Sequence, residues 1–197
     1  VVDVDNDTND VTILVAELEA KDNDIELNTV IVRIDVDDAS ATTTSVTDVV
    51  DDVYVVIDGE SFKAESIGTE ADYSASADGA NNGLNQGYSE LAHATNSVWY
   101  LFDIDGDVVL DEDDAVDMEV VVDFNDTDDG ARYNNGTLIS AYITSTETNE
   151  WEAEGADDLA NSQFDGAASG DEHTLVAEGI LVPADGFSAE EEQLGQD

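Results

Sequence analysis

The stretch that decides the fold is Thr29–Val36, which reads TVIVRIDV. Its hydrophobic residues recur with a period of two, and its β-branched side chains suit the pleated surface of a strand. Three other segments repeat the pattern: Val11–Leu18 (VTILVAEL), Val53–Asp58 (VYVVID) and Ser61–Ile67 (SFKAESI). Four more strand-like segments follow at Val98–Ile104, Ala115–Phe124, Thr137–Thr144 and Thr174–Val182. These eight segments, without a strong helical period, predict an all-β fold, an antiparallel Ig-like β-sandwich.

Turn residues divide these strands. Asp58-Gly59 predicts a hairpin between the third and fourth segments, because both residues tolerate the positive φ of a primed turn. Two polar segments, Gly68–Ser97 and Ser145–Glu172, interrupt the pattern and are expected to be long surface loops, the second with one helical turn at Asp157–Phe164. We expect residues 1–183 to form a single sandwich domain and residues 184–197 to form an acidic tail or a short helix.

Charge excludes several classes of partner. Of 197 residues, 50 are Asp or Glu and 4 are Lys or Arg, which gives a formal net charge of −46. Nucleic acid and anionic lipid would be repelled, and no apolar run is long enough to span a bilayer. The absence of cysteine excludes disulfides and thiolate metal sites. Because 41% of the residues are hydrophobic, we expect a folded domain adapted to high salt, which loosens below roughly 0.5 M salt, and not a disordered acidic chain.

One stretch has the spacing of a calcium-binding loop. Asp103, Asp105 and Asp107 fit positions 1, 3 and 5 of such a loop, and Asp114 falls at position 12. Carboxylates at these positions would converge on one structural Ca²⁺ or Mg²⁺ ion. Position 6, however, is Val108 where glycine is preferred, and the aspartate at position 12 is short for bidentate coordination. The alternative is a solvated acidic turn between two strands, and no cofactor is required.

Three N-x-[ST] sequons begin at Asn6, Asn125 and Asn135, all in predicted turns beside strands. They predict N-linked glycans on an extracellular protein, with unmodified surface loops as the alternative. Catalysis has less support. Ser89 and His93 lie four residues apart in a polar segment, but the motif around Ser89 lacks the second glycine of a nucleophile elbow. We therefore do not expect an enzyme.

The segment at residues 98–104 contains three aromatic residues, Trp99, Tyr100 and Phe102. Trp99 and Phe102 fall on opposite faces under strict alternation, so both faces of this strand need a cover. We expect both side chains to pack in a core, with a bulge at Asp103. Coverage of one face by another chain is the alternative.

Three segments resemble the outer domain of archaeal flagellins (archaellins). Residues 6–34 contain a strand, the acidic turn Lys21–Asp24, an Ile-x-Leu step and a second strand. Residues 109–122 repeat a hydrophobic step, an acidic turn and a strand, and the strand Thr174–Val182 runs into Pro183. Extreme acidity and several sequons also fit the salt-loving members of that family, whose archaellins are glycosylated.

The resemblance implies a function. It implies a structural subunit that self-associates into a helical, extracellular motility filament, with this β-domain as the outer sheath. Archaellins begin with a long hydrophobic helix that the printed sequence does not contain, so the resemblance covers the β-domain. Other readings are an adhesion pilin, a surface-layer domain or a viral surface domain of a halophile, and a secreted hydrolase.

Overall fold

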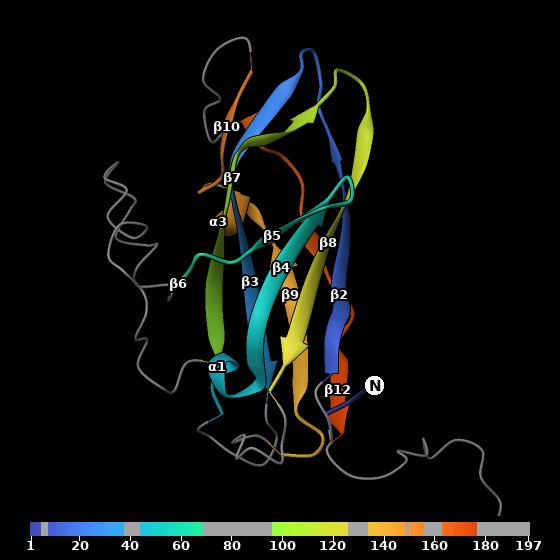
Figure 1. Ribbon diagram of the computed structural model, residues 1–197, viewed down its shortest axis with the longest axis vertical. Coiled ribbons are helices and arrows are strands. Elements are labelled where there is room, and N and C mark those ends of the chain that lie inside the picture. The colour runs from blue at the N-terminus through green and yellow to red at the C-terminus, as the bar shows by residue number, and fades with distance from the viewer. Residues whose placement is uncertain are drawn as a thin grey trace, which may run out of the picture.

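The computed structural model describes residues 1–4, 8–37, 44–68, 96–125, 134–148, 150–155 and 163–176. Within these ranges the strands form two sheets that face each other across an apolar core (Figure 1). The fold is an all-β sandwich, which confirms the class that the alternating segments predict. Among the described residues, no helix is long and apolar enough to cross a membrane.

The smaller sheet has four antiparallel strands in the order β2-β8-β4-β5. Their bounds are β2 Thr8–Glu19, β8 Ala115–Phe124, β4 Val50–Ile57 and β5 Glu60–Lys63. The β4–β5 hairpin turns at Asp58 and Gly59, with φ of 50° and 82°. Two successive positive φ angles match a type I′ turn, so the predicted hairpin is confirmed.

The larger sheet has the order β1-β12-β9-β3-β7-β6, and two short strands join it: β10 beside β3, and β11 beside β9. Its strands are β1 Val2–Asp3, β12 His173–Val176, β9 Leu138–Ile143, β3 Ile25–Asp37, β7 Ser97–Leu110, β6 Ser66–Gly68, β10 Glu152–Glu154 and β11 Ala168–Ser169. Only the pairing of β1 with β12 is parallel among these described strands. The sheet therefore has β3 near its centre, with β7 on one side and β9 on the other.

The core lies between the inner faces of the two sheets. Alternate residues of β3, including Val30, Val32 and Ile34, are fully buried there. Val55 and Val120 are partners on neighbouring strands of the smaller sheet and are also fully buried. The period of two that identified these strands is therefore the period with which they enter the core. A single turn of helix, α1 (Val46–Val49), leads into β4.

One predicted strand is two strands in different sheets. The segment Ser61–Ile67 divides into β5, which pairs with β4, and β6, which pairs with β7. The change occurs between two residues: the Ala64 amide donates to Val53 of β4, and the Glu65 amide donates to Leu101 of β7. The prediction of one strand was wrong here because the polar–apolar alternation continues while the chain crosses between sheets.

The predicted loop Ser145–Glu172 is also partly structured. It contains α3 (Ser145–Thr148), β10 and β11, and Trp151 is only 5% exposed. The expectation of a surface loop was wrong for these residues, because a buried side chain gives the segment its own contacts with the sheet. Three sets of residues lie outside the described part of the chain: residues 69–95 of the other predicted loop, residues 157–162 of the expected helical turn, and residues 177–197.

Candidate functional site

The predicted calcium-loop residues lie on a strand and not in a loop. Asp103, Asp105 and Asp107 all belong to β7, and their side chains are exposed. Asp114 lies beyond the end of β7, in the turn before β8. Among the described residues, no three His, Cys, Asp or Glu side chains are grouped so that they could hold a metal ion. The structure therefore does not bring these four aspartates together as the spacing predicts.

A bulge explains the unusual sequence of this strand. Thr29 pairs with Asp103, and Leu27 pairs with Val108. Between these two pairs β3 has a step of two residues, whereas β7 has a step of five. Asp105 and Gly106 occupy this bulge with φ of 49° and 77°. Positive φ favours aspartate and glycine, so the Asp-Gly pair supplies backbone conformations that the irregularity needs. The bulge that the sequence predicts at Asp103 begins just after it.

Two acidic turns meet at one end of the sandwich. The turn after β2 and the turn after β7 are joined where the Glu112 amide donates to Asp24 Oδ1 (2.8 Å). A second bond joins the Asp113 amide to the Ala20 carbonyl (2.9 Å). The two turns lie next to each other although 88 residues separate Asp24 from Glu112.

The sequon asparagines differ in their surroundings. Asn125 is half-buried, and its Nδ2 donates to the Thr47 carbonyl at 3.2 Å. Asn135 is exposed in the turn that precedes β9. Asn6 lies outside the described residues, and so do Ser89 and His93. Of the sequons whose asparagine is described, Asn135 has the more accessible side chain.

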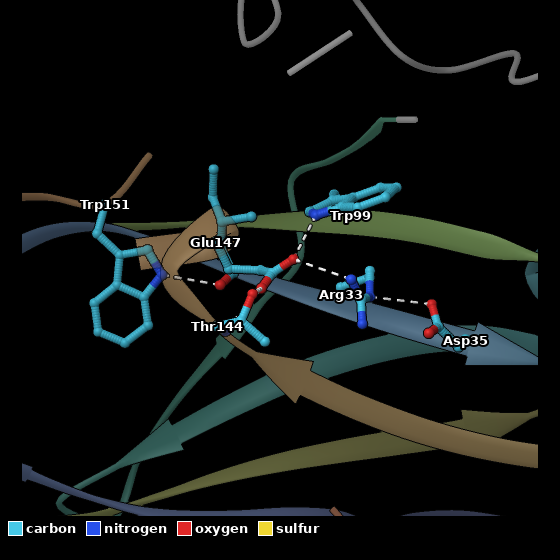
Figure 2. A network of polar contacts seen from close by, with 7 residues as sticks. Arg33, Asp35, Trp99, Thr144, Glu147 and Trp151 are labelled. Atoms are coloured by element: carbon cyan, nitrogen blue, oxygen red, sulfur yellow. Dashed lines mark hydrogen bonds and ion pairs between the residues drawn. The ribbon is translucent and has the colours of Figure 1, made fainter. Parts of the chain in front are cut away.

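The most elaborate group of polar contacts is one that sequence reasoning missed. It lies on the outer face of the larger sheet and consists of Arg33, Asp35, Trp99, Thr144, Glu147 and Trp151 (Figure 2). We call these six residues the Arg33–Glu147 network. They come from β3, β7, α3 and the residues flanking α3.

Arg33 lies between two aromatic residues in one row across the sheet. It is the register partner of Trp99 on β7 and of Tyr142 on β9. Its guanidinium carbon is 5.8 Å from the Trp99 ring centroid and 4.7 Å from that of Tyr142, both within range of a cation–π attraction. Arg33 Nε lies 3.2 Å from Asp35 Oδ1, but the two atoms are not aligned for a hydrogen bond. Their attraction is therefore mainly electrostatic.

Glu147 is a fully buried acidic residue that accepts from several donors. Its Oε2 accepts from the Thr144 amide (2.7 Å) and hydroxyl (2.6 Å), and its Oε1 accepts from Trp99 Nε1 (2.8 Å). Arg33 Nη1 lies 3.8 Å from Oε1. A buried carboxylate is tolerated only when donors and opposite charge replace the water that it loses. These contacts provide that replacement.

The network lies where a strand is interrupted. β9 pairs with β3 from Arg33 to Asp37, and β10 pairs with it from Glu26 to Thr29. Between the two, the chain leaves the sheet as α3. There the Ile31 carbonyl accepts from Trp151 Nε1 (2.9 Å), so a side chain supplies a donor to the sheet beside the interruption.

This arrangement has a structural role. The Glu147 carboxylate and both indole N–H groups are committed to partners within the protein, and Arg33 is only 24% exposed. The contacts fasten α3 and Trp151 onto the outer face of the larger sheet. One local signal could have identified part of the network, because Thr144 and Glu147 have the T-x-x-E spacing of a capping box. In a capping box, the side chain of each of these two residues accepts a hydrogen bond from the backbone amide of the other.

The pKa values of Lys63, Tyr100 and His173 are also shifted by their surroundings. Lys63 Nζ lies 2.6 Å from Asp52 Oδ1, and this hydrogen bond raises the lysine pKa. Burial raises the pKa of the Tyr100 phenol well above its ordinary value, with a further contribution from the charge of Asp52. Burial also lowers the pKa of His173, against the opposing charge of Asp171.

Comparisons with known proteins give no relative for this chain. No family model, curated protein or solved structure matches it.

Proposed function

We propose that this chain is the acidic outer β-domain of a structural subunit that self-associates into a helical, extracellular motility filament of a salt-loving archaeon. The observation that carries the proposal is the joining of the two acidic turns through Asp24 and Glu112. Each turn lies in a segment that resembles the archaellin outer domain. Because the two turns are in contact, the two segments form neighbouring parts of one end of the β-sandwich. This contact supports a resemblance to one domain and not two unrelated similarities.

The body of the domain suits this role. Its interior is apolar and close to continuous across the two sheets, and many of its carboxylates are on the surface. Such a domain presents the same acidic exterior on each copy. Copies with that charge can pack side by side only where salt screens them, because the Debye length falls from ~10 Å at 0.1 M to ~3 Å at 1 M.

The test uses the absence of cysteine from the sequence. The variant Val15→Cys, at a position 61% exposed on β2, is produced from the complete gene in a halophilic archaeon and labelled on living cells with a membrane-impermeant maleimide dye. The proposal predicts fluorescent filaments that rotate on swimming cells. The control Val55→Cys, at a fully buried position, stays dark.

Each other outcome contradicts the proposal in a different way. A continuous fluorescent layer over the cell indicates a surface-layer protein, and straight filaments that never rotate indicate an adhesion pilin. Label on virus particles indicates a viral surface domain. Cells that swim normally without labelled filaments, while the labelled protein is present in the lysate, contradict an extracellular location.

A further inference from the structure

Asn135 and Gly136 form a dipeptide that is chemically reactive in an unfolded chain. The Asn135 side chain is exposed, and because glycine follows it, no Cβ hinders the approach of the next backbone nitrogen. In a flexible chain the glycine nitrogen can attack the side-chain amide, which is one reason why asparagine is a heat-labile residue. The fold therefore decides whether this pair reacts.

The pair occupies the two central positions of a type II turn. The Thr137 amide donates to the Asn134 carbonyl (3.0 Å), and Gly136, third in the turn, has φ of 94°. A type II turn sets ψ of its second residue, here Asn135, to about +120°. At that angle the Gly136 nitrogen points away from the Asn135 side chain, whereas ring closure requires both on the same side.

One residue of β12 holds the attacking nitrogen in place. The Gly136 amide donates to the Leu175 carbonyl (2.8 Å), and the Leu175 amide donates to the Thr137 carbonyl (2.8 Å). Leu175 is 0% exposed, so its side chain anchors this strand in the core. The Gly136 nitrogen cannot keep this bond and also turn toward Asn135.

β12 is a short strand near the edge of the larger sheet (Figure 1). It pairs with β9 through His173–Ile139 and Thr174–Leu138, and the strand on its other side, β1, has two residues. Short peripheral strands open locally at a lower free energy than the whole fold. Detachment of β12 would release the Gly136 amide.

We propose that Asn135 is a site of spontaneous deamidation that is controlled by the attachment of β12. The closed turn protects the asparagine, and opening of β12 allows it to react. The modification needs no enzyme, and it does not depend on the proposed function.

The reaction is an acyl substitution within the dipeptide. The Gly136 nitrogen gives its proton to hydroxide and attacks Asn135 Cγ, so a C–N bond forms. The bond from Cγ to Nδ2 breaks, and Nδ2 takes a proton from water and leaves as ammonia. The resulting succinimide ring adds water at either of its two carbonyl carbons and opens to aspartate or isoaspartate. No group is oxidised or reduced.

The product makes a reversible opening permanent. Either product adds a negative charge to the turn, and isoaspartate also lengthens the backbone by one carbon. The lengthened backbone no longer matches the spacing of the two hydrogen bonds to Leu175. The modified turn therefore binds β12 less well than the original turn.

The test measures deamidation of Asn135 by peptide mapping, on the chain produced without N-glycosylation, because a sugar on Nδ2 would block the reaction. In mildly alkaline buffer with molar KCl, we expect the folded chain to react at least about tenfold more slowly than the chain unfolded in urea. Asn82-Gly83, the second Asn-Gly pair in the sequence, is the internal reference in urea. Equal rates at Asn135 in the folded and unfolded chains, or no reaction there in urea, overturn the proposal.

A pair of matched variants separates opening of β12 from unfolding of the whole chain. Leu175→Ala on β12 and Ile57→Ala on β4 each remove three carbons from a side chain that is 0% exposed. With urea used to bring both variants to equal global stability, we expect Leu175→Ala to deamidate several-fold faster at Asn135. Equal rates in the two variants overturn the role of β12.

Hydrogen exchange of the wild-type chain makes the same comparison if Leu175→Ala does not fold. The Gly136 amide is expected to exchange before the Val55 amide at the centre of β4, because β12 opens without the rest of the fold. Simultaneous exchange of the two amides overturns the role of β12.

Discussion

Removal of the Glu147 side chain tests the structural role of the Arg33–Glu147 network. In Glu147→Ala, Trp99 Nε1 loses its partner at a position only 4% exposed, which costs about 1–3 kcal/mol. The lost methylene adds about 0.8 kcal/mol. Breaking a buried ion pair costs about 3–5 kcal/mol when the remaining charge stays buried, but Arg33 is partly exposed and keeps Asp35 nearby. We therefore expect the free energy of unfolding to fall by about 3 kcal/mol.

The assay is urea unfolding in about 3 M KCl, because guanidinium chloride would itself screen the charges. Tryptophan fluorescence reports directly, since Trp99 and Trp151 both belong to the network. A loss of this size corresponds to a fall of about 6–12 °C in the melting temperature of a chain of this length. The control Glu154→Ala removes an exposed carboxylate on β10, and its effect is expected to stay within about 0.5 kcal/mol. A loss below about 1 kcal/mol in Glu147→Ala would refute the assigned role.

Three other perturbations have defined outcomes. Gly170→Ala would place its Cβ 1.9 Å from the Ile13 carbonyl oxygen, so urea unfolding is expected to show a loss of about 1–3 kcal/mol, against no change in the exposed neighbour Ser169→Ala. Burial lowers the pKa of His173, so the unfolded chain binds a proton more readily than the folded chain. The free energy of unfolding is therefore unaffected by this residue above about pH 6.5 and decreases as the pH falls below that value. In urea unfolding curves, His173→Gln should show a smaller decrease. Burial raises the pKa of Tyr100, so on raising the pH the phenol ionises in the unfolded chain before it does in the folded chain, and the free energy of unfolding decreases above about pH 10. Tyr100→Phe should lose less stability than the wild-type chain above that pH. An equal loss in both chains would contradict this assignment.

The strands could be predicted from sequence wherever the pattern was local. Val32, Ile34 and Val36 alternate with the charged residues Arg33 and Asp35 and are buried with the same period. Asp58-Gly59 forms the expected hairpin because its backbone requirement is contained in two residues. Strands of two or three residues, such as β1 and β11, are too short to show any period.

The network could not be predicted in the same way, because its contacts join distant residues. Glu147 is one of 50 acidic residues, and its partner Trp99 lies 48 positions away. Alternation correctly indicated that Trp99 and Phe102 both need cover, and both are buried. It could not show that α3 supplies cover on the outer face, since a four-residue helix between polar segments has no period of its own.

The calcium-loop pattern failed for a related reason. Spacing alone cannot distinguish carboxylates that converge in a loop from carboxylates that project from an extended strand. Asp103 and Asp107 belong to β7, and the glycine between them serves the bulge. In a chain with so many aspartates, the pattern carries little information without the backbone conformation.

The central claim is that this sandwich needs salt because its carboxylates face one another across the surface. Glu17 is the register partner of Asp117, and Glu26 is that of Glu154. At a separation of about 5 Å, each like-charged pair repels by about 0.8 kcal/mol in water, and molar salt reduces this several-fold.

The most direct measurement is the free energy of unfolding in urea as a function of KCl concentration, for the wild-type chain and for Asp117→Asn. The account predicts that wild-type stability rises steeply with salt, and that the variant is more stable in dilute salt and depends on salt less strongly. Stability that does not change with salt, or an equal dependence in both chains, would contradict it.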